Sequence, residues 1–91
     1  MNDPVSQSQS PAVVFESYFG PSLFRPWGEA LLRRVDLRPD DRVLDLACAT
    51  GTVARLVAET GSDAAEVHGL DSSAAMLEVA RGAAADAGLA I

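Results

Sequence analysis

Apolar positions recur along the chain with two spacings, and each spacing predicts one kind of element. Two short runs, Arg42–Leu46 and Glu66–Leu70, hold closely spaced apolar residues, which is typical of strands in a parallel sheet covered on both faces. Residues 52–60 repeat apolar side chains every three or four positions, as one helix face requires. A similar helix, capped by one of two serines after the second strand, is expected to run to about Ala87. This order predicts an α/β fold with parallel strands and right-handed crossovers.

Two further helices are expected before the first strand. The earlier one, over residues 12–19, has a face of apolar positions spaced by three and four: Val14, Phe15, Tyr18 and Phe19. Gly20-Pro21 is expected to end it. The later helix, over residues 26–35, starts with a proline and is expected to turn four side chains toward the core: Trp27, Ala30, Leu31 and Val35. An alternative gives the aromatic residues a second role, in which Tyr18 or Phe19 closes over a bound ligand.

Composition narrows the class of protein. Residues 1–11 are polar, rich in Ser and Gln, and are expected to form a disordered leader to one partial domain over residues 12–91. The net charge of −6 argues against nucleic acid or an anionic membrane as a partner. The chain holds no apolar run near the roughly 20 residues of a membrane helix and no basic signal at its start, so a cytoplasmic location is expected. Its one cysteine allows no internal disulfide and no cysteine zinc cluster, and no metal site is expected.

The candidate chemistry gathers where the first strand ends. Ala47 to Gly51 form a turn with almost no side-chain bulk, so a ligand can lie against the backbone, near the amide groups that start the next helix. Asp45 precedes this turn and Asp71 follows the second strand, and the carboxyl ends of neighbouring parallel strands meet at one edge of a sheet. Asp71 also lies 20 residues after Gly51, which fits a carboxylate that accepts hydrogen bonds from ribose hydroxyls.

The turn does not fit a dinucleotide such as NAD. A G-x-G-x-x-G loop that begins at position 47 needs glycines at 47, 49 and 52, whereas the chain has Ala47, Ala49 and Thr52. The carboxylate at the strand end, Asp45, also suits a ligand with a positive end better than a pyrophosphate. Binding of NAD is therefore disfavoured at this turn.

Two motifs in this region resemble those of a known enzyme family. Residues 43–51, V-L-D-L-A-C-A-T-G, are similar to the first motif of class I S-adenosylmethionine-dependent methyltransferases, V-L-D-L-x-C-G-T-G. Residues 69–77, G-L-D-S-S-A-A-M-L, are similar to the next motif, G-x-D-x-S-x-x-M-L. Residues 18–27 resemble the lead-in of small-molecule methyltransferases of the ubiquinone/menaquinone-methylase type. The resemblance implies a Rossmann-like fold, S-adenosylmethionine as cofactor and a small molecule as methyl acceptor.

The resemblance also implies where the cofactor lies. The turn would contact its methionine part, with Asp45 near the amino group, and Asp71 would bind the ribose. Ser72 and Met76 would flank the adenosine, and Tyr18 would reach the methionine end. The full set of implied cofactor residues is Asp45, Ala47, Cys48, Ala49, Gly51, Asp71, Ser72, Met76 and Tyr18.

No catalytic side chain is expected in this chain. Methyl transfer depends mostly on proximity and alignment, so it does not require a base in the cofactor-binding half of the fold. Cys48 is expected to be a small buried residue of the turn and not a nucleophile, and no catalytic role is expected for His68.

The chain departs from the family pattern in two ways. Ala49 stands where the family has glycine, and a left-handed backbone there would cost about 1 kcal/mol or more. The family fold is a seven-stranded sheet, whereas this chain provides the first two strands and their helices. We therefore expect the isolated chain to transfer no methyl group. The alternative reading is a non-catalytic interaction module, or a split subunit completed by another chain.

Overall fold

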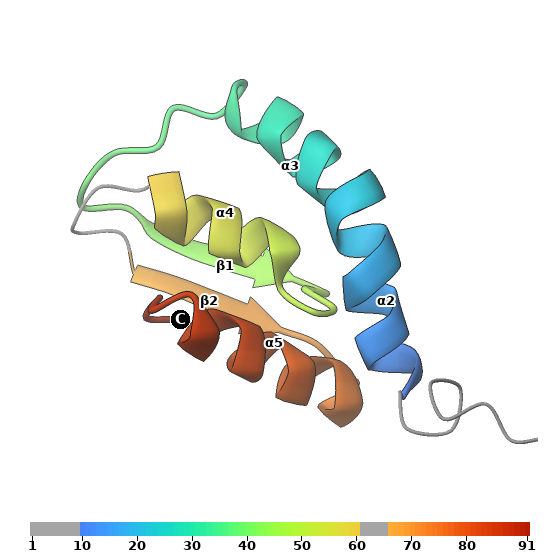
Figure 1. The fold of residues 1–91 in the computed structure, drawn as a ribbon. Coiled ribbons are helices and arrows are strands. Elements are labelled where there is room, and N and C mark those ends of the chain that lie inside the picture. Colours follow the sequence, from blue (N-terminus) through green and yellow to red (C-terminus); the bar gives the residue numbers. More distant parts are fainter. Residues whose placement is uncertain (1–9, 61–65) are drawn as a thin grey trace, which may run out of the picture.

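The computed structural model describes residues 10–60 and 66–91 (Figure 1). The elements in chain order are α2 (Pro11–Phe19), the π-helical turn η1 (Gly20–Phe24), α3 (Arg25–Leu32), β1 (Arg42–Leu46), α4 (Thr52–Thr60), β2 (Glu66–Leu70) and α5 (Ala74–Asp86). The predicted bounds of both strands and of α4 are confirmed. Most of the expected leader, residues 1–9, and the loop after α4 lie outside the described residues.

The two strands form a parallel pair with α4 as the connection between them. Their register runs from Arg42 opposite Glu66 to Leu46 opposite Leu70, so both strands end at the same edge. This arrangement confirms a Rossmann-like α/β fold, of which the described residues form two strands and their helices. Among the described residues, no helix is long and apolar enough to cross a membrane.

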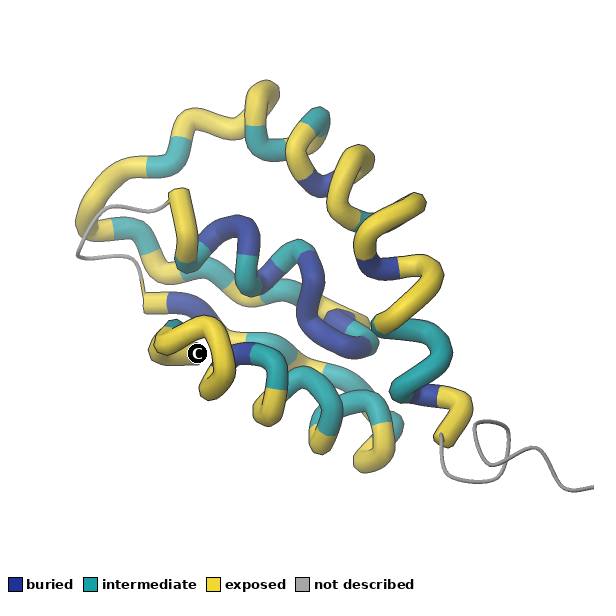
Figure 2. The backbone as a smooth tube through the Cα atoms, viewed as in Figure 1, coloured by how far each residue is buried: buried dark blue, intermediate teal, exposed yellow. Residues whose placement is uncertain are grey.

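The core lies on one face of this sheet. Ala54 and Val57 of α4 pack with Val67 of β2, and partly buried side chains surround them: Leu32, Leu37, Val43 and Ala58. The alternation of exposed and covered residues along both strands is visible in Figure 2. It follows the period of two by which successive strand side chains point to opposite faces.

The expectation that both faces of the sheet are covered is wrong for the described residues. Leu44, Leu46 and Leu70 point away from α4 and remain 59%, 70% and 54% exposed. Their apolar character predicts burial, but α4 covers only the opposite face. The sheet therefore presents an apolar face of the kind that parallel sheets normally bury.

The N-terminal helices form one continuous helical segment: α2 ends at Phe19, as predicted, but the chain stays helical through Gly20-Pro21 instead of leaving the helix there. A proline has no N–H group, and its ring crowds the carbonyl four residues before it. Here the chain widens into η1, in which Gly20 N–H donates to the carbonyl of Phe15 and Arg25 N–H donates to the carbonyl of Gly20. This five-residue spacing accommodates the proline without ending the helix.

The start of this segment also differs from the expectation. Pro11, expected in the leader, is the first residue of α2, where its missing N–H has no cost. Ser10 caps the helix, because its hydroxyl accepts a hydrogen bond from Val13 N–H at 3.2 Å. The helix therefore begins one residue earlier than the apolar spacing predicts.

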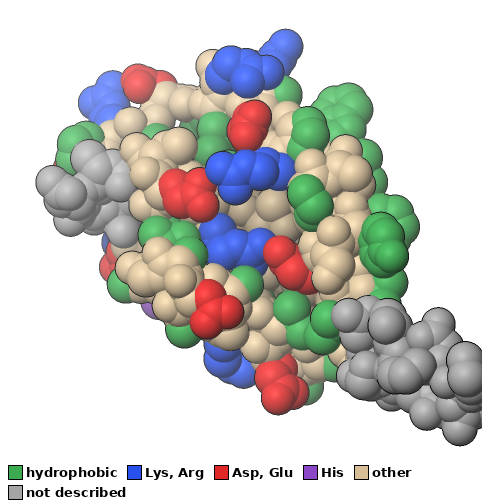
Figure 3. Space-filling view, viewed as in Figure 1, with side chains coloured by type: hydrophobic (Ala, Val, Ile, Leu, Met, Phe, Trp, Pro, Cys, Tyr) green, Lys and Arg blue, Asp and Glu red, His purple; other side chains and the backbone are tan. Residues whose placement is uncertain are grey.

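The inward face expected for α3 is also wrong. Trp27, Leu31 and Val35 are 70%, 52% and 45% exposed, and α3 ends at Leu32. Hydrophobic side chains of the N-terminal helical segment gather along the outer edge of the molecule in Figure 3. Gly28 faces α4 and is buried, because its missing side chain allows the two helices to approach.

We expect Gly28→Ala and Gly82→Ala to change stability in opposite directions. A Cβ at Gly28 would lie 2.6 Å from Cδ1 of the buried Leu56, so the variant should lose about 1 kcal/mol through overpacking, although alanine favours helices. A Cβ at Gly82 in α5 meets nothing within 4 Å, so that variant should gain about 0.5–1 kcal/mol. Chemical denaturation measures both values, and equal gains would contradict close packing of α3 on α4.

Candidate functional site

The turn between β1 and α4 has an unusual backbone. Ala47, Ala49 and Gly51 have φ values of 57°, 50° and 83°, so every second residue is left-handed. Ala49 therefore has the left-handed backbone whose cost for alanine the sequence raised. Ala47 shares this conformation, which the analysis of the sequence did not predict. Each left-handed alanine costs roughly 1–2 kcal/mol, so the surrounding contacts must hold the turn in place.

Asp71 is one of these contacts. Its Oδ2 accepts a hydrogen bond from Ala49 N–H at 2.9 Å, and its Oδ1 accepts one from Ser73 N–H at 2.8 Å. These bonds lower the pKa of Asp71 because they stabilise the ionised carboxylate. The predicted meeting of the two acidic strand ends is confirmed: Asp71 crosses from the end of β2 to the turn that follows β1.

Asp45 holds the other side of the turn. Its Oδ2 accepts a hydrogen bond from Ala54 N–H at 3.1 Å, in the first turn of α4. Burial raises the pKa of Asp45 and the charge of Asp71 adds to the rise, whereas the bond from Ala54 opposes it. The two carboxylates therefore make this edge of the sheet electrostatically negative, which favours a ligand group with a positive charge.

A small cavity of about 150 Å³ opens on the turn. One wall is aromatic, formed by Phe15 of α2 and Phe24 of η1, whose ring centroids lie 5.2 Å apart. The rest of the lining comes from the strand end, the turn and the start of α4: Asp45, Ala47, Cys48, Ala49, Thr50, Thr52 and Val53. The cavity is smaller than a typical ligand pocket of roughly 300–1,000 Å³, so it can enclose only one end of a nucleoside ligand.

Two buried hydroxyl groups in this lining have no hydrogen-bond partner among the described residues. Oγ1 of Thr50 and Oγ1 of Thr52 are fully shielded and unpaired. Leaving such a group unpaired costs about 1–3 kcal/mol, so a ligand that pairs with it recovers this free energy. The sequence pattern did not single out either hydroxyl or either phenylalanine as part of the site. Phe15 belongs to the apolar face predicted for the first helix, but spacing alone does not distinguish a side chain that covers the turn from one that faces solvent.

The remaining predicted residues fall in different places. Cys48 is buried, and burial, followed by the charges of Asp45 and Asp71, raises the pKa of its thiol. This agrees with a structural role, because the thiolate is the nucleophilic form. Tyr18 is 67% exposed and does not line the cavity.

Ser72 and Met76 lie where α5 begins. Ser72 is exposed, and Met76 is partly covered and donates its N–H to Oγ of Ser73 at 3.2 Å. Ser73 is therefore the cap of α5, one of the two serines that the sequence offered for this position. Ser72 directly follows Asp71 in the chain, and Met76 lies in the first turn of α5.

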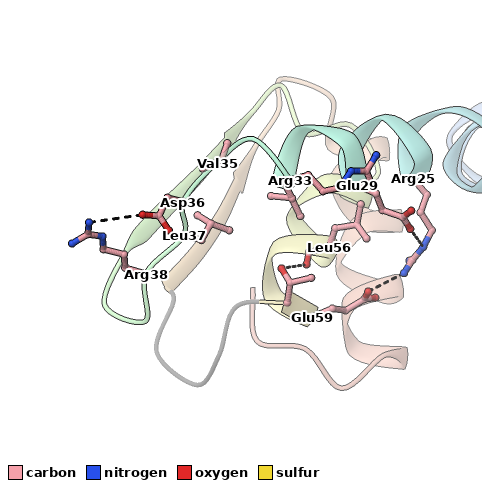
Figure 4. Close-up of a pocket in the computed structure, with 11 residues that line it drawn as sticks. Arg25, Glu29, Arg33, Val35, Asp36, Leu37, Arg38, Leu56 and Glu59 are labelled. Carbon is pink, nitrogen blue, oxygen red and sulfur yellow. Dashed lines mark hydrogen bonds and ion pairs between the residues drawn. The ribbon is translucent and has the colours of Figure 1, made fainter.

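A larger groove of about 660 Å³ lies between α3, the loop that follows it and α4 (Figure 4). Its charged side chains pair with one another: Arg25 contacts Glu29 at 3.3 Å and Glu59 at 3.1 Å. None of the predicted cofactor residues lines it. The smaller cavity on the turn is therefore the better candidate, because the sequence motifs and the unpaired hydroxyls meet there.

Comparison with known proteins identifies the family. A family model described as a methyltransferase domain matches residues 43–91, which is more than half of the chain. The chain belongs to the methyltransferase family. Residues 43–46 of β1, the turn and Asp71 lie within the match to this methyltransferase domain.

Three relatives show the extent of the similarity. A trans-aconitate 2-methyltransferase of Pseudomonas paraeruginosa is 50% identical over 50 residues, covering 55% of this chain and 18% of the relative. A 2-phytyl-1,4-naphtoquinone methyltransferase of Synechococcus elongatus is 40% identical, covering 64% and 25%. A ubiquinone/menaquinone biosynthesis C-methyltransferase of Bordetella avium is 34% identical, covering 84% and 30%. The chain therefore spans less than a third of the length of these relatives.

Methyltransferases of this kind generally use S-adenosylmethionine, and the residues on the turn fit one end of it. The cofactor carries positive charge on its sulfonium and ammonium groups, which suits the negative edge made by Asp45 and Asp71. The small side chains of Ala47 and Ala49 line the cavity and add little bulk between a ligand and the backbone of the turn.

We expect Ala49→Gly to stabilise the methyltransferase domain. Glycine removes the penalty of roughly 1–2 kcal/mol that alanine has in a left-handed backbone. It also raises the conformational entropy of the unfolded chain, which costs about 0.5–1 kcal/mol of stability, so the net gain should be up to about 1 kcal/mol. The matched control is Ala85→Gly in α5, which should lose about 1 kcal/mol. Both follow from denaturant titration, and a loss at both positions would show that the turn at Ala49 relaxes in solution.

We expect Asp45→Asn to be more stable than the wild type at pH 7 in the absence of ligand. The folded-state pKa of Asp45 is raised, so its ionised form opposes folding above that pKa, and the folded chain takes up the proton more readily as pH falls. The asparagine oxygen can still accept from Ala54 N–H. The difference in melting temperature should therefore be positive at pH 7 and vanish below the ordinary aspartate range. A difference that is negative at every pH would mean that the hydrogen bond outweighs burial.

Proposed function

We propose that this chain binds S-adenosylmethionine at the turn between β1 and α4, as part of a methyltransferase that acts on a small molecule. The observation that carries the proposal is the hydrogen bond from Ala49 N–H to Asp71. It joins the two motif regions at one edge of the sheet, where open α/β sheets bind their ligands. The positive groups of the cofactor would lie against an edge that Asp45 and Asp71 make negative.

The proposal gives each residue a role. Asp45 would lie near the ammonium group, and the backbone of Ala47, Cys48, Ala49 and Gly51 would line the methionine part. Asp71 keeps free lone pairs on both oxygens beside its two backbone bonds, so it could still accept from the ribose hydroxyls.

The start of α5 and the N-terminal helix supply the remaining roles. Ser72 and Met76 would flank the adenosine. Tyr18 would reach the methionine end only if α2 turned it toward the cavity, since it is exposed in this structure. The bound cofactor supplies an activated methyl group, and the residues of this chain bind and orient it.

The acceptor is proposed as a small molecule on the names of the relatives. One relative is named for trans-aconitate, and the others for naphthoquinone or ubiquinone/menaquinone substrates. All three names refer to small organic compounds, and these compounds differ in polarity. The cavity on the turn is too small to hold an acceptor beside the cofactor, so acceptor binding would need surfaces beyond it.

The second candidate function is a subunit completed by another chain. The exposed face of Leu44, Leu46 and Leu70 favours it, because this apolar surface has no cover among the described residues. Such a complex would keep the same cofactor turn. The two candidates therefore differ in what covers the sheet, not in what binds at its edge.

The test is a two-dimensional ¹⁵N–¹H NMR titration of the chain with S-adenosylhomocysteine, which detects weak as well as tight binding. We expect the amides of the turn and of the start of α5 to shift, with little response to NAD. Asp71→Ala should weaken binding by about tenfold or more, because it removes both a ribose acceptor and a bond that holds the turn.

Asp86→Ala is the matched control, since Asp86 is an exposed acid at the far end of α5. It should bind like the wild type. An unchanged affinity in Asp71→Ala would remove Asp71 from the site. Shifts confined to the groove between α3 and α4 would overturn the assignment of the turn.

A further inference from the structure

Arg55 and Glu16 form the most buried ion pair among the described residues. Nη2 of Arg55 in α4 lies 2.9 Å and 2.8 Å from the two carboxylate oxygens of Glu16 in α2. The two side chains are only 12% and 26% exposed, whereas the other ion pairs of the described chain lie at more open positions. A pair with this little solvent is screened weakly and holds its geometry better than a surface pair.

The same guanidinium also contacts the cofactor turn. Nη1 of Arg55 donates to the carbonyl of Thr50 at 2.6 Å, and Thr50 is fully buried between Ala49 and Gly51. The guanidinium group is planar and rigid, so its two nitrogens fix the positions of their partners relative to each other. Arg55 therefore joins the backbone of the turn to a helix that lies 39 residues earlier in the chain.

The position of α2 decides whether the cavity is closed. Phe15 directly precedes Glu16, and together with Phe24 it forms the wall opposite the turn. The other ion pair between the N-terminal helical segment and α4, Arg25 with Glu59, is roughly half exposed and lines the groove away from the turn. The Glu16–Arg55 pair is therefore the contact best placed to hold the aromatic wall over the turn.

We propose that the Glu16–Arg55 ion pair positions the N-terminal helix over the cofactor turn, so that Glu16 and Arg55 are positioning residues for cofactor binding. The inference rests on the proposed function for its second half. Neither side chain lines the cavity on the turn. Arg55 acts through the carbonyl of Thr50, and Glu16 acts through the placement of Phe15. Loss of the pair would lift the aromatic wall and expose the turn.

The first test needs no cofactor. Cys48 is the one cysteine of the chain and lies buried where the turn meets Gly69 of β2, so its rate of reaction with a thiol reagent such as dithionitrobenzoate reports how often the turn moves away from its neighbours. We expect Glu16→Gln to raise this rate by about tenfold, because it leaves Arg55 without its counter-charge. The matched control, Glu59→Gln, breaks the more exposed pair with Arg25 and should react like the wild type.

Arg55→Lys serves as a second variant with the positive charge retained. A lysine ammonium cannot hold both Glu16 and the Thr50 carbonyl in the fork geometry, so the rate should again rise. Circular dichroism confirms that each variant is folded before labelling. A wild-type rate in Glu16→Gln and Arg55→Lys would overturn the inference. An equal rise in Glu59→Gln would also overturn it, because general loosening would then explain the result.

The second test measures affinity for S-adenosylhomocysteine by NMR titration. Glu16→Gln should bind about tenfold more weakly than the wild type, and Glu59→Gln should bind equally well. Equal affinity in both variants, with faster labelling of Cys48 in Glu16→Gln alone, would limit the pair to covering the turn and would overturn its role in binding. Faster labelling together with no binding by any variant, the wild type included, would overturn the proposed function and leave the contact between helix and turn established.

Discussion

The carboxylate of Asp71 is the contact on which the site depends. It accepts the Ala49 N–H on one side and the Ser73 N–H on the other, so one side chain fixes the turn after β1 and the start of α5. The turn needs such support because Ala47 and Ala49 adopt a backbone that alanine avoids. Asp45 on Ala54 N–H and Arg55 on the Thr50 carbonyl complete the support. The strained backbone is thus held by side chains of β1, of α4 and of the residue after β2, beside backbone bonds from Cys48 N–H to the Leu70 carbonyl and from Gly51 N–H to the Cys48 carbonyl.

The electrostatics of the site follow from the same arrangement. Two carboxylates meet at one edge of the sheet, and their surroundings shift the two pKa values in opposite directions. Hydrogen bonds from two amides stabilise the charge of Asp71, whereas burial and the neighbouring acid oppose that of Asp45. A ligand with a positive group relieves this opposition, and a pyrophosphate would add to it. The negative charge is therefore a property of the whole edge and not of one residue.

The sheet that carries this site is covered on one face only in the described residues. Leu44, Leu46 and Leu70 remain exposed beside a core built from α4 and the opposite face. The turn nevertheless keeps its contacts, because all of them come from β1, α4, β2 and the N-terminal helices. The contacts that hold the turn therefore do not depend on what covers the exposed face of the sheet. The chain itself spans 18–30% of the length of the relatives described above.

The sequence by itself determined the elements near the site. The bounds of β1, β2 and α4, the meeting of Asp45 and Asp71 and the methyltransferase motifs could all be predicted, because they depend on local periodicity and on residue types at short spacing. Only the tertiary structure decided that Gly20-Pro21 lies inside a continuous helix, that Trp27 faces solvent and that Phe15 with Phe24 covers the turn. It also decided that Arg55 pairs with Glu16 and that two threonine hydroxyls lie buried without a partner. The physical reason is that periodicity shows which side chains share a helix face, whereas the direction of that face is set by contacts between residues far apart in the chain.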